Sequence, residues 1–383
     1  MDICDVLIVG GGPAGSSCAW ALRDSGLDVL IVDRATFPRE KLCGGWITPL
    51  VLEELEIDAA QYGLGRTLQP ISGFRVGTVG SAGVAVNCGR TVSYGIRRCE
   101  FDDYLLRRCG ARLREGYPVN SVERHAEEWV VNGEIRARML VGAGGHFCPI
   151  PQTTGDKSQQ QAVVAREVEF EMSSDEADAC PSAGETPELY FSRDMKGYGW
   201  CFRKGGFLNI GLGRLDPHRL GEHVEEFLDF LKRSRQLKLG REPRFAGHAY
   251  FLFGHSRRKV VSDGLLLVGD SAGLAFAQSG EGIRPAVESG LLAAAAIVSA
   301  EGDYSRKRLQ AYSDMLDSRF AHAHTSIEKL AQHAPAFLRN LAARALLRTR
   351  RFARFVVEQW FLRDADPKLS VEPHRRTATR TVA

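Results

Sequence analysis

The sequence predicts an α/β protein in which a nucleotide-binding domain made of separated segments carries an inserted antiparallel-sheet domain and is followed by a helical region. Three observations support this prediction. A strand, a helix and a second strand follow one another in about the first thirty residues. A short apolar run ending in glycine returns at 139–142 and 265–270. Residues 66–94 and 156–257 alternate polar and apolar side chains, which is typical of half-buried antiparallel strands.

The first elements are predicted from apolar runs and the residues that end them. Asp5–Val9 is apolar and is followed by glycines, which suits a buried parallel strand. Pro13–Ser25 is predicted as a helix and Asp28–Asp33 as a second buried strand. We expect the later runs, Met139–Gly142 and Leu265–Asp270, to complete the same domain.

The alternating segments set the domain boundaries. Val168–Met172 and Phe207–Gly211 show the clearest alternation and are expected in the inserted sheet. From about residue 302 onward the chain is predicted to be helical, with a loose tail. The expected organisation is 1–65, 95–155 and 258–301 for the nucleotide-binding domain, 66–94 and 156–257 for the substrate-binding sheet domain, and 302–383 for the helical region and tail.

Composition narrows the class of protein. The chain has 383 residues, of which 44% are hydrophobic and 25% charged, as in ordinary globular proteins. A net charge of +3 gives no case for a nucleic-acid partner. The nine cysteines form no C-x-x-C pair, so we expect no disulfide framework, no metal site and a reducing, cytoplasmic compartment. The longest apolar stretch, Leu291–Ala300, is too short to span a bilayer, which leaves peripheral membrane contact open.

A glycine fingerprint follows the first strand. Gly10–Gly15 fits G-x-G-x-x-G, in which the first glycine makes the turn, the second lets a pyrophosphate approach and the third lets helix pack on strand. The helix N-terminus that follows favours an anion. Asp33 ends the second strand, where its carboxylate can accept hydrogen bonds from ribose hydroxyls. A tight turn alone also uses glycine, but this context favours a dinucleotide.

Three further stretches stand out. They are Phe37–Trp46, which contains F-P-R-E-K-L-C-G-G-W, Arg98–Asp102, which reads R-C-E-F-D, and Gly269–Gly273 followed by Gly280–Ile283. Together with the fingerprint, they resemble motifs of the FAD-dependent hydroxylase superfamily and, within it, of the geranylgeranyl-reductase-like group. The matching stretches spread over residues 5–290. The resemblance implies a Rossmann-type FAD-binding domain with FAD as the cofactor.

The resemblance also implies roles for single residues. Asp270 would hold the ribityl chain, and Arg98 would lie near the cofactor diphosphate with Arg39 and Lys41 close by. Gly280 and Gly282 precede a helix over Ile283–Ala300, whose N-terminus would point at the pyrimidine edge of the flavin. The residues expected to bind the cofactor are Gly10, Gly12, Pro13, Ala14, Gly15, Asp33, Arg34, Lys41, Cys43, Gly44, Arg98, Gly269, Asp270, Gly280, Gly282 and Ile283.

Three positions depart from the superfamily pattern. Ala277 stands where many members have proline, three residues before the first glycine of G-x-G. Glu281 lies between the two glycines and would oppose the charge of reduced flavin if it pointed inward. Many hydroxylases of the superfamily carry G-A-D-G where this chain has Gly142–Gly145, and their aspartate is tied to FAD and NADPH contacts. Because Gly145 has no side chain, the electron donor stays open between NADPH and a reduced protein such as a reductase or ferredoxin.

Three side chains are candidates for catalysis. Cys43 lies in a loop that borders the active site in the similar reductases, where a thiol could donate a proton or steer substrate; a buried cysteine is also simply a small hydrophobe. Tyr198 belongs to Gly197–Gly205, a stretch similar to the Y-x-W-x-F-P-K-G strand of the reductases, and could wall the pocket, donate a proton or lie in the sheet core. His248 could be a general acid near pH 7 or a hydrogen-bonded structural histidine.

A basic stretch precedes the tail. Lys329–Val357 holds seven Lys or Arg residues and no Asp or Glu, and leucines interleave with the arginines. A basic amphipathic helix can lie on anionic lipid, and it can also cap the protein with its arginines in water. The sequence favours the cap. Lipid contact would suit a polyprenyl substrate.

The resemblance therefore predicts an FAD-dependent oxidoreductase. The expected reaction is reduction of carbon–carbon double bonds in a long apolar, prenyl-like small molecule, by hydride transfer from reduced flavin. The alternative is an FAD-dependent monooxygenase that acts through a flavin hydroperoxide, since one fold serves both. A non-enzymatic electron carrier is disfavoured because such proteins typically need an iron–sulfur module, and the cysteines are not clustered.

Overall fold

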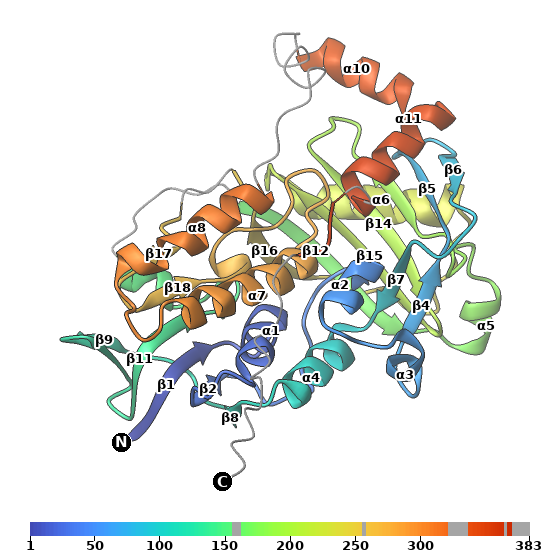
Figure 1. Cartoon of the computed structure of the whole chain (residues 1–383). Coiled ribbons are helices and arrows are strands. Elements are labelled where there is room, and N and C mark those ends of the chain that lie inside the picture. Colours follow the sequence, from blue (N-terminus) through green and yellow to red (C-terminus); the bar gives the residue numbers. More distant parts are fainter. Residues whose placement is uncertain (155–161, 255–257, 321–335, 364–365, 370–383) are drawn as a thin grey trace.

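A computed structural model describes residues 1–154, 162–254, 258–320, 336–363 and 366–369. The described chain forms three sheets with helices around them (Figure 1). The predicted α/β class is confirmed, with a mainly parallel sheet, an antiparallel sheet and a helical C-terminal region.

The first sheet has eight strands and is mainly parallel. Its central order is β17-β18-β11-β1-β2-β8, and a hairpin of β9 and β10 pairs with β11. The strand at its centre is apolar from Val6 to Val9, and all four side chains are buried, because a parallel strand is covered on both faces. The bounds are β1 Asp2–Val9, β2 Val29–Val32, β8 Arg112–Arg114, β9 Val122–His125, β10 Glu128–Val131, β11 Ile135–Gly142, β17 Val261–Ser262 and β18 Leu265–Leu267.

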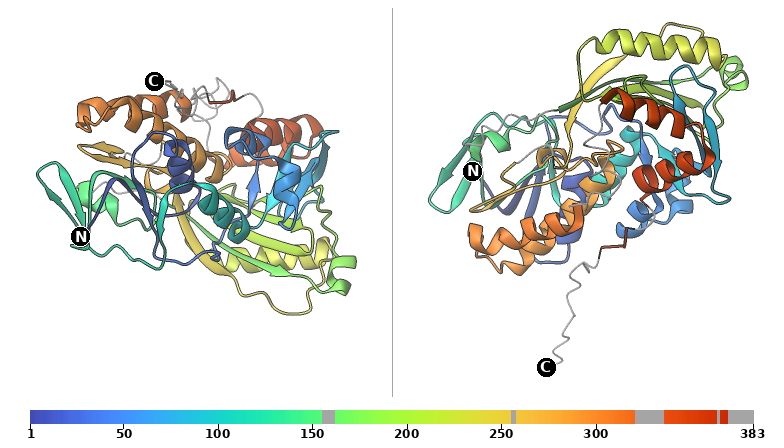
Figure 2. Two further views of the ribbon diagram at one scale, coloured as in Figure 1. Left: turned by 60° about the horizontal axis from the view of Figure 1, so that its bottom comes forward. Right: turned by 90° about the horizontal axis from the view of Figure 1, so that it is seen from above.

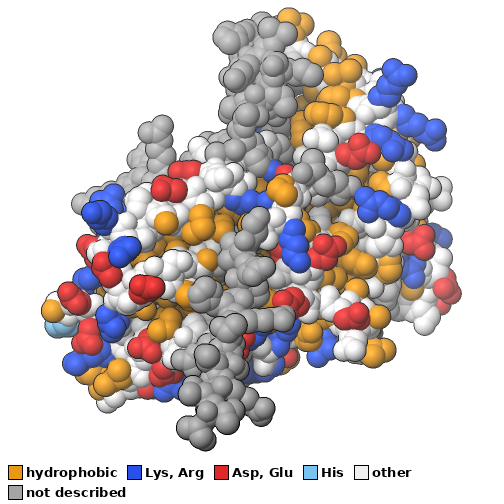
Figure 3. All heavy atoms as spheres, viewed as in Figure 1, with side chains coloured by type: hydrophobic (Ala, Val, Ile, Leu, Met, Phe, Trp, Pro, Cys, Tyr) orange, Lys and Arg blue, Asp and Glu red, His pale blue; other side chains and the backbone are white. Residues whose placement is uncertain are grey.

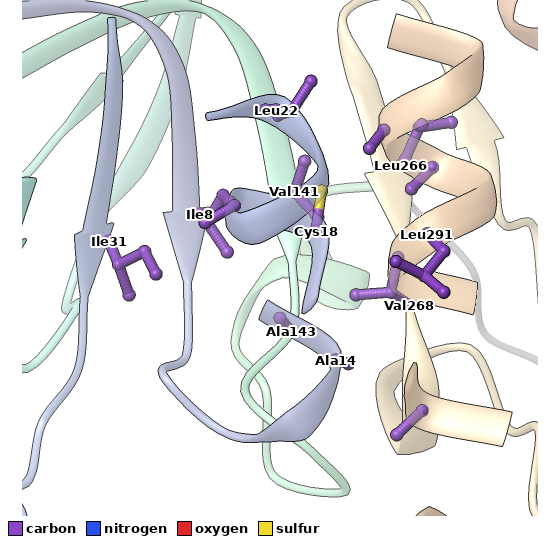
Figure 4. Close-up of a cluster of buried hydrophobic side chains, with 14 of the residues drawn as sticks. Ile8, Ala14, Cys18, Leu22, Ile31, Val141, Ala143, Leu266, Val268 and Leu291 are labelled. Atoms are coloured by element: carbon purple, nitrogen blue, oxygen red, sulfur yellow. The ribbon is translucent and has the colours of Figure 1, made fainter. Parts of the chain in front are cut away.

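Two helices pack together beside this sheet. Helix α1 (Pro13–Leu22) lies between β1 and helix α7 (Ile283–Ser299), and Figure 4 shows Cys18 of α1 between Ile8 and Leu291. The crossing is close because a Cβ at Gly290 would lie 2.3 Å from the carbonyl oxygen of Ala14. This packing fixes the start of α1 and the start of α7 at one edge of the sheet.

The second sheet has seven strands in the order β16-β12-β15-β14-β13-β5-β6, antiparallel except for β13 and β5. Helix α6 (Leu220–Ser234) covers one face, where Phe227 contacts Gly199. The other face turns toward the first sheet and the C-terminal helices, as Figure 2 shows. The bounds are β5 Gly73–Thr78, β6 Val84–Asn87, β12 Ala162–Glu171, β13 Glu188–Phe191, β14 Gly197–Lys204, β15 Phe207–Arg214 and β16 Ala246–Phe251.

A small third sheet joins the two larger ones. Its order is β3-β7-β4, formed by Trp46–Ile47, Ser93–Ile96 and Leu68–Ile71. The segment 66–94 is therefore divided: β4 pairs with β7 here, whereas β5 and β6 belong to the seven-stranded sheet. The sequence alternation did not distinguish the two, because the pairing partners of β4 and β5 lie far along the chain. Helix α4 (Arg98–Arg108) follows β7 directly.

The C-terminal part is helical, as predicted. Helix α8 (Arg306–Phe320) packs on α7. Helix α11 (Arg350–Phe355) and the π-helix η3 (Val356–Leu362) lie against the seven-stranded sheet, and α10 (Ala336–Leu346) precedes them. Residues 329–335 of the predicted basic stretch fall outside the described residues. The remaining elements are α2 Pro49–Glu54, α3 Ala59–Gly63, α5 Ser174–Asp178, and the 3-10 turns η1 Ile150–Thr154 and η2 Gly269–Ser271.

Among the described residues, no helix is both long enough and apolar enough to cross a bilayer.

Candidate active site

A cavity of about 770 Å³ lies between the parallel sheet and the seven-stranded sheet. One end is lined by the loops that follow β1, β2 and β18, which leave the parallel sheet at its carboxyl edge. The other end is lined by β14, by β16 and by Phe361 of η3. Segments that are far apart in the sequence therefore share one space.

The β1–α1 loop opens this space. Gly10 has φ +117°, and a Cβ there would lie 2.4 Å from the carbonyl oxygen of Ala143, so only glycine fits. At Gly12, the residue before α1, a Cβ would meet only a guanidinium nitrogen of Arg39, at 3.5 Å. No side chain caps α1, so its first backbone amides face the cavity. The loop thus offers amide donors and room for an anion.

Asp33 anchors the same loop. Its Oδ2 accepts a hydrogen bond from the Gly11 amide at 2.8 Å, and its Oδ1 accepts one from the Ala35 amide at 2.8 Å. The carboxylate lines the cavity and retains lone pairs that a ribose hydroxyl can use.

A buried ion cluster lies beside the α1 N-terminus. Asp102 is fully buried and accepts two hydrogen bonds of 2.8 Å from Arg98. Arg39 reaches the same carboxylate at 3.2 Å, while its Nη1 is buried without a partner among the described residues. Although burial opposes the shift, Asp102 and the facing Cys43 raise the pKa of Arg98. This guanidinium, whose Nη2 would lie 3.5 Å from a Cβ at Gly12, fits a diphosphate group.

The loop before α7 closes the cofactor end. Gly280 has φ +68°, and a Cβ there would lie 2.4 Å from the hydroxyl of Tyr250; a Cβ at Gly282 would lie 3.2 Å from Oδ1 of Asp270. Burial raises the pKa of Asp270, and the charges of Lys41 and Arg98 oppose this shift. The backbone of this loop therefore lies close to the side chain of Tyr250 at Gly280 and to the side chain of Asp270 at Gly282.

The loop is also held from the sheet. The Tyr198 hydroxyl donates a hydrogen bond to the carbonyl oxygen of Ser279, and the Ser279 hydroxyl accepts one from the Glu281 amide at 3.3 Å. Phe276 donates its amide to the Glu281 carbonyl at 2.9 Å. The backbone around Glu281 is thereby fixed at both ends.

Glu281 borders the cavity, but both oxygens of its carboxyl are buried. The residue is only 7% exposed. Burial raises the pKa of its carboxyl to about 7, and Arg284 opposes this shift. Below that pH the carboxyl is neutral, so it does not oppose the charge of a reduced flavin.

One face of the seven-stranded sheet forms the wall opposite these loops. Tyr198, Trp200 and Phe202 alternate onto this face of β14 and line the cavity. Their neighbours on β15 include Gly213 and Gly211, and a Cβ at Gly211 would lie 2.2 Å from the Trp200 ring. The glycines thus give the large rings the space they occupy.

More aromatic rings complete the apolar end. Trp46, Phe74 and Phe361 line it, with ring centroids 5.5 Å apart for Phe361 and Tyr198 and 6.0 Å apart for Phe361 and Trp46. Large rings packed together in this way exclude water from the space they surround.

The Cys43 loop is fastened to this wall. Trp200 donates its indole N–H to Oδ1 of Asn209 at 2.7 Å, and Asn209 donates to the Cys43 carbonyl oxygen at 3.2 Å. The Cys43 sulfur accepts the Gly45 amide at 3.4 Å. A Cβ at Gly44 would lie 3.5 Å from the Trp200 ring nitrogen. The loop thereby presents its backbone between the two ends of the cavity.

Most of the residues predicted from the sequence come together here. Two of the sixteen residues expected to bind the cofactor do not line the cavity. Gly15 packs inside the protein, where a Cβ would lie 2.0 Å from the Gly10 carbonyl oxygen. Gly269 packs on Ala14. Those that line it are Gly10, Gly12, Pro13, Ala14, Asp33, Arg34, Lys41, Cys43, Gly44, Arg98, Asp270, Gly280, Gly282 and Ile283, together with Tyr198 and His248.

Burial changes the pKa values of two of the predicted proton donors. With Lys41 and Arg98 nearby, burial lowers the pKa of His248 to about 3, so its imidazole is neutral near pH 7. Burial also raises the pKa of Tyr198, whose proton is already donated to Ser279. Neither side chain is poised to release a proton.

Several residues that line the cavity give no signal in the sequence. Tyr117 and Asn120 follow β8, a strand that reads Arg-Leu-Arg and gives no apolar signal. His146 follows Gly145, a residue with φ +75° whose Cβ position is open. Phe361 gave no local signal, because it reaches the cavity only through the packing of the C-terminal helices.

The sequence is similar to that of known proteins. Residues 3–325 match the family described as "FAD binding domain". Menaquinone reductase of Mycobacterium tuberculosis is 32% identical over 356 residues, which cover 86% of this chain and 84% of the relative. Digeranylgeranylglycerophospholipid reductase of Methanocaldococcus jannaschii is 27% identical over 331 residues, covering 81% of each chain.

A solved structure shares the fold. A geranylgeranyl bacteriochlorophyll reductase-like protein from Thermoplasma acidophilum superposes with a TM-score of 0.75 at 21% identity, covering 94% of this chain and 97% of that one.

Proposed function

The chain belongs to this FAD-binding family and is an FAD-dependent oxidoreductase, and from that premise we propose that it reduces carbon–carbon double bonds of a long, apolar, prenyl-like substrate. The similar proteins named as reductases of a menaquinone and of a digeranylgeranyl lipid support this proposal.

One observation carries the proposal. A single cavity joins a polar end, lined by the uncapped start of α1 and by Arg39, to an apolar end walled by aromatic rings. The polar end suits a dinucleotide, and the apolar end suits a hydrocarbon chain that must be kept from water. The cofactor and an apolar substrate would therefore meet inside the protein.

The residues at the polar end fit FAD. We propose that Gly12 and the α1 amides, with Arg39 and Arg98, hold the diphosphate, that Asp33 holds the adenosine ribose and that Asp270 holds the ribityl chain. When bound and reduced, FAD supplies a hydride.

At the apolar end, side chains of the protein position the neighbouring loops and shield the substrate from water. We propose that Trp200, through Asn209, sets the Cys43 loop, and that Tyr198 holds the loop before α7 through Ser279. Cys43 then shapes the floor of the substrate site beside Arg98. Holding the alkene next to the cofactor supplies much of the rate.

Helices α10 and α11 offer a surface for lipid. Leu338, Leu341 and Leu346 are exposed, with Leu341 at 61%, and exposed arginines interleave with them. Figure 3 shows hydrophobic and basic side chains together over α10 and α11, near the top of the view. We propose that this surface rests on an anionic bilayer, from which a lipid substrate would enter beside η3.

The test uses purified protein loaded with FAD, reduced without oxygen and mixed with a geranylgeranyl lipid in detergent. The expected result is reoxidation of the flavin by the lipid and a product that has gained two hydrogens. A product that gains an oxygen atom, formed only when oxygen is admitted, would establish the monooxygenase instead. A matched pair of variants, Trp46→Ala at the cavity and Trp129→Ala in the parallel sheet, separates substrate binding from folding.

A further inference from the structure

A second cavity, of about 340 Å³, lies between the β5–β6 hairpin and the end of helix α10. It shares no lining residue with the candidate active site. The described residues that line it include two arginines and no acidic side chain, so two positive charges are left unbalanced within the lining. These residues are Gly77, Thr78, Ser81, Ala82, Gly83, Val84, Arg344, Leu347 and Arg348.

The two arginines lie on one side of the chain. Arg344 belongs to the last turn of α10 and Arg348 follows four residues later, a spacing that places side chains next to each other. Leu347, beside Arg348, is buried against the seven-stranded sheet and forms the floor of the cavity. Neither guanidinium makes a hydrogen bond or an ion pair among the described residues, whereas Arg354 on α11 reaches Glu358 at 3.5 Å. Both forks are therefore available to an anion.

The segment that carries the arginines is fastened to the sheet on both sides of them. Asn340 on α10 donates a hydrogen bond to the Asp194 carbonyl oxygen at 3.0 Å. Arg354 on α11 donates one to the carbonyl oxygen of Asn87, at the end of β6, at 3.2 Å. The helical wall of the second cavity is thus held in place before any ligand binds.

The hairpin wall is equally well defined. The Ser81 hydroxyl accepts a hydrogen bond from the Thr78 amide at 3.0 Å and donates one to the Thr78 carbonyl oxygen at 2.8 Å. A Cβ at Gly77 would lie 2.7 Å from the Ser81 Oγ, so this close turn requires glycine. The two walls together form a fixed cationic recess rather than a pair of loose surface arginines.

Strand β5 connects this recess with the apolar end of the active site. Phe74, Val76 and Thr78 alternate onto one face of the strand. Phe74 lines the active-site cavity and Thr78 lines the second cavity, and four residues of a strand span about 13 Å. Val76 between them is buried in the same cluster as Leu347 and Phe361. Apolar packing therefore continues from the aromatic wall to the two arginines.

We propose that the second cavity binds a phosphate ester group, and that this group is the polar head of the lipid whose chain lies in the aromatic end. The inference rests on the proposed function and names a group that the substrate carries. An anion is costly to bury among aromatic rings, so the head must stay outside the apolar end. Two guanidinium forks at about 13 Å from Phe74 provide hydrogen bonds and charge for it there.

The first experiment measures binding without the reaction. Oxidised, FAD-loaded protein in an uncharged detergent is titrated with geranylgeranyl phosphate and with geranylgeraniol, and calorimetry gives both affinities. We expect the wild type to bind the phosphate about 10-fold to 100-fold more tightly, the range for hydrogen bonds to a charged group. Arg344→Gln with Arg348→Gln should remove this preference and keep the affinity for the alcohol. A preference that survives in this variant would overturn the assignment.

A matched variant and a second probe control for other sources of attraction. Arg350→Gln with Arg351→Gln removes the same charge from α11, outside the second cavity, and should keep the preference for the phosphate. Equal loss in both variants would assign the preference to the basic segment as a whole and overturn the site. Inorganic phosphate should bind much more weakly than the lipid phosphate, because it has no chain for the aromatic end. Equal affinity would assign the cavity to a free phosphate instead of the substrate head.

The reaction separates this inference from the proposed function. With pre-reduced protein, the KM for geranylgeranyl phosphate should be lower than that for geranylgeraniol, and Arg344→Gln with Arg348→Gln should make the two values equal without changing kcat. Equal KM values in the wild type would contradict a phosphate head, although the reductase proposal would stand. If the wild type reduces neither lipid, the proposed function fails, and the calorimetric comparison alone decides whether the second cavity binds a phosphate-bearing lipid.

Discussion

At the scale of single residues, glycines a few positions apart in the β1–α1 loop have different functions. A Cβ at Gly12 would point into the cavity, next to Arg39, whereas a Cβ at Gly15 would collide with the Gly10 carbonyl oxygen at 2.0 Å. We expect Gly12→Ala to fold normally and bind FAD at least about tenfold more weakly, a loss of about 1.4 kcal/mol. Flavin fluorescence titration measures the affinity, and calorimetry of the apoprotein measures the melting temperature.

Gly15→Ala is the matched control for Gly12→Ala. It adds the same methyl group inside the protein and should lower the melting temperature of the apoprotein. Equal melting temperatures and equal FAD affinities for the two variants would contradict this division of roles.

His248 gives a pH-dependent prediction for the apoprotein. Its pKa is lowered to about 3 in the folded state, so between that value and the ordinary value of about 6.5 the unfolded chain binds a proton that the native state does not. The free energy of unfolding should therefore decrease as the pH is lowered through this window, by about 1.4 kcal/mol per pH unit from this group. His248→Asn should remove that part of the slope in urea titrations. An unchanged slope would mean that His248 is protonated in the native state.

At the scale of elements, α10 and α11 carry the membrane prediction. Arg339→Glu with Arg348→Glu should weaken binding to phosphatidylglycerol vesicles by at least about 30-fold, since each basic residue contributes about 1 kcal/mol near an anionic surface. Co-sedimentation with the vesicles at low and high salt measures this binding. The control Arg306→Glu with Lys307→Glu makes the same charge change on α8 and should bind like the wild type. Equal loss in both pairs would point to general charge attraction.

The individual elements also show which parts of the fold the sequence could predict. The residues of β1, α1, β2 and α7 combine apolar runs with glycines whose positions have a steric reason, so these elements and their ligand-facing ends followed from local pattern. Strand β8 did not, because only its middle residue is apolar and Arg112 and Arg114 flank it. The division of β4 from β5 depends on pairing partners far along the chain, which alternation does not encode.

At the scale of the molecule, the site depends on contacts between distant segments. Phe361 lies beside Tyr198 only because η3 packs on the seven-stranded sheet. The raised pKa of Glu281 likewise depends on burial by α7 and the segment after η3. The sequence indicated the cofactor end through its motifs, whereas the apolar end and its protonation states arise from packing across the whole chain.

Lys204 links the seven-stranded sheet to the small third sheet, and this link gives the last prediction. It lies on β14 and is 1% exposed, and its Nζ donates to the Ile96 carbonyl oxygen at 2.9 Å and to Glu169. Lys204→Met removes both contacts and leaves Glu169 with Arg97, at 3.3 Å, and Asn209. We expect a loss of about 2 to 4 kcal/mol in unfolding free energy.

The effect on cooperativity tests whether Lys204 couples the parts. In the wild type, FAD should raise the melting temperature of one calorimetric transition, because ligand binding stabilises every part that unfolds with the site. In Lys204→Met the transition should split, and FAD should shift only the component that contains the β1–α1 loop. Lys238→Met, a change at an exposed lysine, should behave as the wild type. A single transition in Lys204→Met that moves as a whole with FAD would show that the aromatic wall and the Cys43 loop suffice to join the two sheets.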